Sequence, residues 1–413
     1  MGIASRGRGA DVEGVSDMRL FSRRVYTASG PRSGAIEVRE GRIASFEERG
    51  DCPPDAIDYG PWRVIPGIVD THNHGTFGYE ASGGHGPAEA RAESIRAYLR
   101  CLAAQGTTGV FATVMRPEEI ALVAEVAEED PTDGAQLLGI HSEGPWLARV
   151  GEKGVRSPWP EPSVETARQM VRDGRGLLRL VALAPEIPGA DALVDCFLSE
   201  GVVVAAAHSD NDYAGAQRTY ARGVSVSTHT GNVMTGMHHR DIGGLGAALT
   251  NPDVTCEVIC DGMHVSNPML DIYFRVKSPG RFMMISDSTA FSGAPVGRYR
   301  SDLAPEIVVT EQGFVLSDTG RIMGSSQPVL YGIGNLVDHV GVPLETCLEM
   351  ACLNPAEKYG LAGEKGSIEP GKDADLVVVS DDWRALVTYV RGRKVFDRAH
   401  GAPAYNMSYL VRA

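Results

Sequence analysis

The feature that most constrains this chain is a repeated arrangement in which an apolar, strand-like run ends in a histidine or a carboxylate. A run that begins at Val64 ends in His72 and His74. Similar runs later in the chain end in Glu143, His208, His229 and Asp287. Parallel strands of an α/β barrel present such side chains together at one end, where they can bind a metal. The pattern therefore predicts a barrel that carries a metal site.

Strand-like runs alternate with amphipathic helical segments through the middle of the chain. One helix is expected over residues 91–104, where Ile95, Leu99 and Leu102 recur at helical spacing before Gly106. The eight strand-like runs lie near 64–70, 109–114, 137–142, 178–184, 202–207, 224–228, 254–260 and 282–286. Eight strands with crossover connections favour an α/β fold of the (β/α)8 TIM-like barrel type.

Both ends of the chain show the alternation that is typical of half-buried antiparallel strands. These stretches cover 20–26, 35–46, 366–379 and 385–396. We therefore expect one small β-sandwich built from both chain termini. The expected domains are a sandwich over 18–63 and 364–413 and a barrel over 64–363. Residues 1–17 are rich in Gly and Arg and are expected to form a disordered extension.

The composition argues against several function classes. The 413 residues are 43% hydrophobic and 22% charged, which is ordinary for a soluble globular enzyme. No apolar run approaches the roughly 18 residues that cross a bilayer, so no membrane partner is expected. The formal net charge of −14 argues against a nucleic-acid partner. An anionic substrate would need a local basic cluster, for which the segment 238–240 is a candidate.

The seven cysteines do not suggest a disulfide framework. Their number is odd, and no spacing suits a zinc knuckle. We expect buried, reduced thiols, which implies a cytoplasmic location. The glycine-rich pieces lack nucleotide-binding spacing, so no nucleotide cofactor is expected. The segment 144–163, rich in Pro and Gly, is a candidate active-site lid.

The strand-end residues suit a hydrolytic metal centre. Because His72 and His74 lie two apart on a strand, they share a face and can reach one ion. Imidazole and carboxylate ligands suit zinc or iron. A divalent cation lowers the pKa of bound water to about 7, which makes hydroxide available as a nucleophile at neutral pH. Asp287 can accept the proton of the attacking water and return it to a leaving amine.

Longer motifs surround these positions. They include Pro66-Gly-Ile-Val-Asp-Thr-His-Asn-His74, Glu143-Gly-Pro-Trp146, Asp261-Gly-Met-His264 and Asp373-Ala-Asp-Leu376. On these motifs the chain resembles the N-acetylglucosamine-6-phosphate deacetylases of the amidohydrolase superfamily, over nearly all of residues 20–380. The resemblance implies hydrolysis of the acetamide of an N-acetyl amino-sugar 6-phosphate, which yields the amino sugar phosphate and acetate.

The resemblance also implies a role for each strand-end residue. Glu143, His208 and His229 would hold the main catalytic metal. His72 and His74 would hold a second one, which shares Glu143 or Asp287, so one or two ions are expected per chain. Asp287 would act as general base and general acid.

The resemblance further implies residues that recognise the substrate. His264 would contact the sugar phosphate. Asn232, the backbone at Val233, and Arg240 would bind the phosphate, for which the planar fork of an arginine is well suited. In the family a neighbouring subunit can supply part of this site, so a homodimer is expected.

Two segments depart from the family pattern. The family usually has Lys-Gly-x-His-x-Pro in the lid, whereas here Arg156 stands at the histidine position of Lys153-Gly-Val-Arg-Ser-Pro158. Near the sixth strand this chain has Gly231-Asn-Val-Met234, where the family commonly has an aromatic residue and Asn-Ala-Met. Both changes concern substrate recognition, and Arg156 is a candidate for an added anion contact. N-acetylgalactosamine-6-phosphate, another N-acyl or cyclic amide, and a non-catalytic metal-stabilised barrel therefore remain alternatives.

Overall fold

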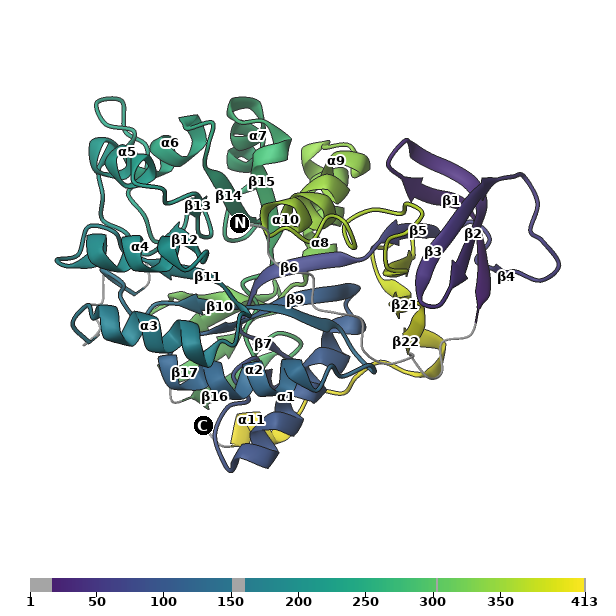
Figure 1. The fold of residues 1–413 in the computed structure, drawn as a ribbon, viewed down its shortest axis with the longest axis horizontal. Coiled ribbons are helices and arrows are strands. Elements are labelled where there is room, and N and C mark those ends of the chain that lie inside the picture. The colour runs from purple at the N-terminus through teal and green to yellow at the C-terminus, as the bar shows by residue number, and fades with distance from the viewer. Residues whose placement is uncertain (1–16, 151–159, 302–303, 412–413) are drawn as a thin grey trace.

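A barrel of eight parallel strands forms the centre of the protein, which confirms the predicted fold class (Figure 1). The computed structural model describes residues 17–150, 160–301 and 304–411. Of the expected N-terminal extension, only Asp17 lies within these residues. Arg156 lies outside them. In chain order the barrel strands are β6 (Ile68–Asn73), β9 (Thr107–Val114), β10 (Gln136–Glu143), β11 (Leu178–Leu183), β12 (Val203–Ala206), β13 (Val226–Ser227), β14 (Thr255–Ile259) and β15 (Phe282–Ile285).

The barrel closes where β6 meets the residues that follow β15. The backbone N–H of Asp287 donates to the carbonyl of His72 at 2.9 Å. Asn73 and Ser288 form an isolated parallel bridge at the same seam. The first and last strands therefore meet through the residues that carry the predicted site.

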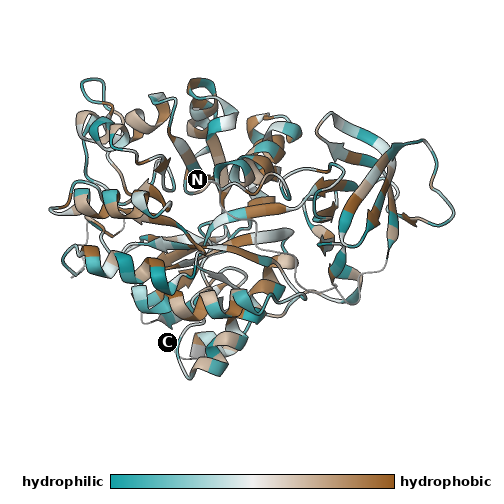
Figure 2. Ribbon diagram, in the orientation of Figure 1, coloured by the Kyte–Doolittle hydropathy of each residue, from teal (hydrophilic) through white to brown (hydrophobic). Residues whose placement is uncertain are grey.

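Helices surround the barrel. They are α1 (Ala88–Ala103), α2 (Ile120–Glu128), α3 (Val164–Asp173), α4 (Ala190–Ser199), α5 (Tyr213–Ala221), α6 (Gly243–Thr250), α7 (Asn267–Val276), α8 (Val329–Asn335), α9 (Leu344–Leu348) and α10 (Asn354–Lys358). Two π-helical segments, Leu336–Val340 and Glu349–Leu353, join the last three. The helices mix brown and teal in Figure 2, because most of them turn an apolar face to the strands and a polar face outward, whereas α6 is buried over nearly its whole length.

A second sheet joins the two ends of the chain, at the right of Figure 1. Its strands are β1 (Met18–Thr27), β2 (Gly30–Arg39), β3 (Arg42–Glu48), β4 (Ile57–Asp58), β5 (Arg63–Pro66), β20 (Leu376–Val379), β21 (Ala385–Val390) and β22 (Arg393–Asp397). The order is β22-β21-β20-β5-β1-β2-β3, with β4 beside β1. Leu20, Ile36 and Val378 lie in its separate apolar core. The expected sandwich of both termini is thereby confirmed.

The run at 64–70, expected to be one barrel strand, is divided between the two sheets. Val64 pairs with Val378 in the terminal sheet, whereas the barrel strand begins at Ile68. The chain crosses at Gly67, where an added Cβ would lie only 2.1 Å from the hydroxyl oxygen of Thr108. Only glycine allows this close approach, so the continuous apolar pattern conceals a change of sheet.

A four-stranded antiparallel sheet, which the periodicity did not reveal, follows β15. Its strands are β16 (Gly297–Ser301), β17 (Ala304–Val309), β18 (Phe314–Ser317) and β19 (Ile322–Ser325). A short hairpin of β7 (Gly75–Thr76) and β8 (Tyr79–Glu80) follows β6. The backbone N–H of Ser325 donates to the carbonyl of Asp287 at 3.0 Å. The inserted sheet therefore braces the loop that carries Asp287.

The last residues of the chain leave the terminal sheet, in contrast to the expected sandwich over 364–413. Helix α11 (Met407–Val411) lies beside the inserted sheet, and Leu410 is buried against Phe291 (Figure 1). The backbone N–H of Asn406 donates to the carbonyl of Phe77 at 2.9 Å. The C-terminal segment thus packs on the loops after β6 and β15.

The cysteines agree with the expectation of reduced thiols. All seven are free, and all except the half-buried Cys52 are buried. Within the described ranges, no helix is both long and apolar enough to cross a membrane.

A buried ion triad stabilises the terminal domain. The ammonium group of Lys365 lies 2.8 Å from Asp373 and 2.7 Å from Asp375, and its side chain is only 4% exposed. Burial alone would lower the pKa of Lys365, but the two carboxylates raise it above its ordinary value. The lysine therefore remains charged inside the protein.

We predict that Lys365→Met lowers the free energy of unfolding by about 3–5 kcal/mol, because two buried carboxylates lose the cation between them, although Asp373 keeps a second ion pair, with the partly exposed Arg42 at 3.5 Å. Chemical denaturation measures this difference. The matched control is Arg275→Ala, which removes a helical ion pair whose arginine side chain is 74% exposed. Arg275→Ala should change the free energy of unfolding little. Equal stability of the two variants would contradict the role given to the triad.

Candidate metal centre

Six predicted site residues converge at the carboxyl end of the barrel strands. They lie at or just after the ends of five strands, and His72 and His74 share the end of β6: His72, His74, Glu143, His208, His229 and Asp287. Their ligand atoms form two adjacent groups, and within each group these atoms lie within 4.8 Å of one another. The barrel register brings together positions that are up to 215 residues apart, as the sequence predicted.

The first group contains Glu143, His208 and His229. The Nε2 atoms of both histidines lie 3.1 Å from Oε1 of Glu143, and 3.1 Å from each other. All three residues are buried. Two imidazole nitrogens and one carboxylate oxygen at this spacing are a suitable donor set for a tetrahedral cation with one open position.

The second group contains His72, His74 and Asp287. The two Nε2 atoms are 3.2 Å apart, and they lie 3.4 Å and 3.5 Å from Oδ1 of Asp287. Oε2 of Glu143 is 3.1 Å from Nε2 of His74, whereas its Oε1 faces the first group. Glu143 therefore lies between the two groups, where one carboxylate can serve both.

The protonation of the first group favours a cation. Nδ1 of His208 lies 2.9 Å from the carbonyl oxygen of Arg149, which can only accept a hydrogen bond. A neutral His208 must therefore carry its proton on Nδ1 and present the Nε2 lone pair to the group. Burial would raise the pKa of Glu143, but the surrounding imidazoles, His72 foremost, hold it well below its ordinary range. The carboxylate is thus available as an anionic ligand.

Three of the six residues have an unusual backbone conformation. His208, His229 and Asp287 have φ values of 48°, 29° and 49°. This left-handed region costs a non-glycine residue about 1–3 kcal/mol. Each follows the end of a strand and turns its side chain toward the centre of the barrel mouth. The surrounding fold therefore compensates for local strain at these three positions.

A hydrogen-bond network holds the seam beneath the second group. The hydroxyl of Ser286 donates to Asp70 at 2.6 Å, and the side-chain amide of Asn73 donates to Asp70 at 3.1 Å. The hydroxyl of Tyr98 donates to Oδ1 of Asn73 at 3.0 Å. All four side chains are buried. This network joins β6, β15 and α1, and it fixes His72 relative to Asp287.

His264 is held in a fixed orientation near the barrel mouth. Its Nδ1 lies 2.8 Å from Oδ2 of Asp261, which also accepts a hydrogen bond from the hydroxyl of Ser325 at 2.9 Å. Burial would raise the pKa of Asp261, but its hydrogen bonds and the charge of His264 lower it. An ionised Asp261 keeps Nδ1 of the imidazole as the donor.

The predicted phosphate-binding residues lie in the segment between β13 and α6. The backbone and side-chain amides of Asn232 both donate to the carbonyl of His229, at 2.9 Å and 3.2 Å. Val233 has a φ of 48°. Arg240 is exposed, and its guanidinium contacts His239 rather than the two metal-ligand groups. Asn232 is therefore tied directly to the metal centre, whereas Arg240 lies apart from it.

The expected lid is described only in part, because 151–159 lie outside the described residues. Trp146 is fully buried, with its ring 6.2 Å from that of Phe197. The beginning of the segment is thus anchored in the core.

Two buried polar residues around the site were missed by the sequence reasoning. Glu257 and His141 are both fully buried beside His72. Burial holds the pKa of His141 well below its ordinary value. Their signal in the sequence is a charged or titratable residue within an otherwise apolar barrel strand.

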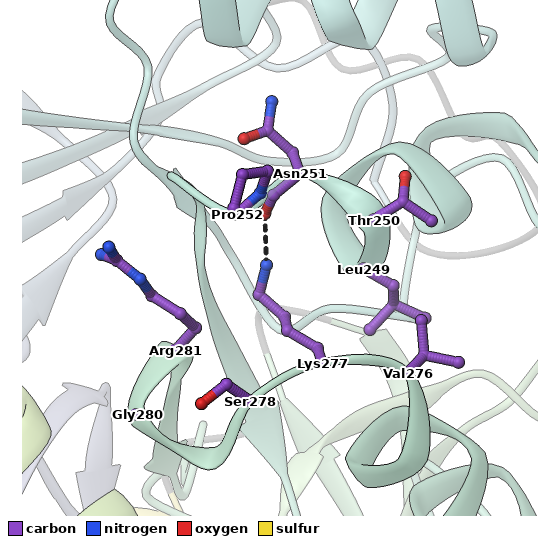
Figure 3. A pocket seen from close by; sticks show the side chains of 9 residues that line it. All are labelled: Leu249, Thr250, Asn251, Pro252, Val276, Lys277, Ser278, Gly280 and Arg281. Atoms are coloured by element: carbon purple, nitrogen blue, oxygen red, sulfur yellow. Dashed lines mark hydrogen bonds between the residues drawn. The ribbon is translucent and has the colours of Figure 1, made fainter.

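A separate cavity of about 410 Å³ lies at the opposite end of the barrel (Figure 3). Its lining comes from the segments that precede β14 and β15. Lys277 donates to the carbonyls of Ala248 at 3.0 Å and Asn251 at 2.5 Å, so its ammonium group caps the end of α6. This arrangement serves the fold and contributes nothing to the metal centre.

We predict that Glu143→Gln lowers zinc binding to both ligand groups, because a neutral amide replaces the shared anionic ligand. Mass spectrometry of the metal content, after dialysis in zinc buffered by a chelator, measures this loss. The control is Glu119→Gln, which changes a buried carboxyl outside the two groups. Unchanged zinc content in Glu143→Gln would rule out the assigned donor set.

The sequence matches the amidohydrolase family over residues 63–395. It is 34% identical over 366 residues to the N-acetylglucosamine-6-phosphate deacetylase of Vibrio furnissii, and the match covers 87% of this chain and 90% of that protein. It is 28% identical over 383 residues to the enzyme of the same name from Bacillus subtilis, with coverage of 88% and 93%.

Solved structures agree with this assignment. The fold resembles N-acetyl-D-glucosamine-6-phosphate deacetylase from Mycobacterium smegmatis with a TM-score of 0.81, at 28% identity, and covers 92% of this chain and 100% of that one. The corresponding enzyme from Thermotoga maritima gives a TM-score of 0.77 at 26% identity, with coverage of 92% and 100%. By sequence and by fold, this chain belongs to the amidohydrolase family.

Proposed function

We propose that this protein hydrolyses the acetamide group of N-acetylglucosamine-6-phosphate, which yields glucosamine-6-phosphate and acetate. The observation that carries the proposal is the cluster of six ligand side chains at the barrel mouth. Support for the substrate comes from relatives that bear the name of this deacetylase and match most of the chain. The reaction breaks a carbon–nitrogen bond of a linear amide.

The donor set is suited to a divalent cation, either zinc or iron. Glu143, His208 and His229 would hold one ion, and His72, His74 and Asp287 a second. When bound, such an ion lowers the pKa of water and polarises an amide carbonyl.

The remaining chemistry belongs to side chains of this protein. Asp287 accepts the proton of the attacking water and returns it to the amine nitrogen as the carbon–nitrogen bond breaks, because an unprotonated amine leaves poorly. His264, fixed by Asp261, contacts the sugar phosphate. Its hydrogen bond to Asp261 limits the orientations that the imidazole can adopt.

The phosphate group would be recognised by cationic and amide groups near the mouth. Asn232 and the backbone at Val233 are close to His229, and Arg240 extends from the same segment. Arg156 adds a cation from the lid segment. A neighbouring subunit completes the phosphate site in a homodimer, and the reduced thiols suit a cytoplasmic enzyme.

The decisive experiment measures acetate release from N-acetylglucosamine-6-phosphate, its galacto epimer and unphosphorylated N-acetylglucosamine. We expect the highest kcat/KM with the gluco phosphate, and chelation should abolish turnover until zinc or iron is restored. A preference for the galacto epimer would change the assigned substrate. Absence of acetate release from all three would refute the proposal.

The contribution of Arg240 can be tested with the same substrates. Arg240→Ala should raise KM for the phosphorylated sugar and leave turnover of the unphosphorylated one unchanged, because only the former carries the group that the guanidinium binds. Equal effects on both substrates would exclude the assigned phosphate contact.

We predict that Asp287→Asn lowers kcat by about 10²–10⁴-fold, which is the usual contribution of a positioned acid or base. Zinc content should be largely retained, since the amide oxygen can still act as a ligand and His72, His74 and Glu143 are unchanged. Stopped assays for acetate, paired with metal analysis of the same sample, separate the two effects. A variant with full zinc content and normal kcat would disprove the proton-transfer role.

A further inference from the structure

Glu257 is a buried carboxylate that the proposed reaction does not use. It lies in the middle of β14, between Cys256 and Val258, and is 0% exposed. A carboxylate is costly to bury unless it has hydrogen-bond or charge partners. The groups around its two carboxylate oxygens therefore indicate its role.

One oxygen of Glu257 is already engaged. The hydroxyl of Thr71 donates to Oε1 at 2.9 Å. The other oxygen, Oε2, lies 3.6 Å from Nδ1 of His72, slightly beyond hydrogen-bond distance. Both of these atoms are buried, and neither has a hydrogen-bond partner within the described part of the chain. The two unsatisfied atoms thus face each other.

The two nitrogens of His72 have different surroundings. Nε2 is directed at the second ligand group, 3.2 Å from Nε2 of His74 and 3.4 Å from Oδ1 of Asp287. When Nε2 offers its lone pair to a cation, the neutral ring must carry its proton on Nδ1. That proton then needs an acceptor inside the barrel.

The imidazole of His141 also packs against His72. The ring of His141 packs edge-on against His72 with centroids 4.5 Å apart, and Nδ1 of His141 lies 3.4 Å from the hydroxyl of Thr113. The contact is between ring edge and ring face. The carboxylate of Glu257 is the anionic group positioned to accept from Nδ1.

We propose that Glu257 is a positioning residue that accepts the Nδ1 proton of His72 and thereby fixes this histidine as a ligand of the second cation. The proposal rests on the two cation sites of the proposed function. It adds Glu257, which faces the ligand His72 from inside the barrel. Outer carboxylates of this kind typically change metal affinity by 10- to 100-fold. Glu257 thus controls occupancy of the second position.

The effect should be confined to one of the two ligand groups. His208 obtains its own Nδ1 acceptor from the carbonyl of Arg149 at 2.9 Å, without any contribution from Glu257. Loss of Glu257 should therefore weaken the group of His72, His74 and Asp287 and spare the group of His208 and His229. Weakening of one ligand group alone distinguishes a positioning role of Glu257 from a general effect on folding.

The test is zinc titration of the metal-free, full-length protein, compared with Glu257→Leu and Glu257→Gln. Leucine removes the acceptor at similar volume, whereas glutamine retains one carbonyl oxygen. We expect the second zinc equivalent to bind about 10- to 100-fold more weakly in the leucine variant. The first equivalent should bind as in the wild type, and glutamine should restore much of the loss.

Three results would overturn the proposal: unchanged affinity for both equivalents, equal weakening of both, or a wild type that binds one zinc only. Thr71→Val is the matched control, because it removes the other contact of Glu257 and leaves the Nδ1 acceptor in place. It should weaken the second equivalent less than leucine does.

A spectroscopic measurement covers the case in which Glu257→Leu fails to fold. Nitrogen NMR of the zinc-loaded wild type, with His72 assigned through His72→Gln, should show a proton on Nδ1. An unprotonated Nδ1 would overturn the proposal. Acetate release from the wild type tests the proposed function separately, so two bound zinc ions without acetate release would refute the substrate and not the role of Glu257.

Discussion

The structure depends on one junction, the hydrogen-bonded seam between β6 and the residues after β15. The buried carboxylate of Asp70 accepts from Ser286 and Asn73, and so joins the first barrel strand to the last. Without this junction the barrel would be an open sheet, and His72 would lie at one edge while Asp287 lay at the other. The same contacts that close the fold therefore assemble the second ligand group.

Glu143 provides a comparable link within the site. Its two oxygens face different histidine groups, so its position couples the two halves of the metal centre. Charge balance also depends on it, because the ligand set brings four imidazoles together with only two carboxylates. The inserted sheet adds rigidity from outside, since Ser325 contacts both the backbone of Asp287 and the carboxylate of Asp261. The site is therefore supported from the barrel and from the insertion.

Much of this could be predicted because strand-end ligands follow from periodicity, and parallel strands place their carboxyl ends together. All eight strands and the convergence of the six candidate ligand residues were expected from the sequence. The division at Gly67 was not, because a change of sheet leaves the apolar pattern unbroken. The left-handed backbone at His208, His229 and Asp287 arises from tertiary packing that local residue type does not reveal. The place of Glu257 beneath His72 depends on barrel register, which one strand alone does not specify.

The course of the final residues has a consequence for how the two domains fold. Strands β20 to β22 complete a sheet that β1 begins, and Tyr405, Asn406 and Leu410 then settle on the loops beside the metal centre. Without these pieces, β5 would lack its partner strand β20, and Phe291 would lose its contact with Leu410. The terminal sheet and the loops after β6 and β15 therefore depend on segments that are far apart in the sequence, and the folding of the two domains is coupled through these long-range contacts.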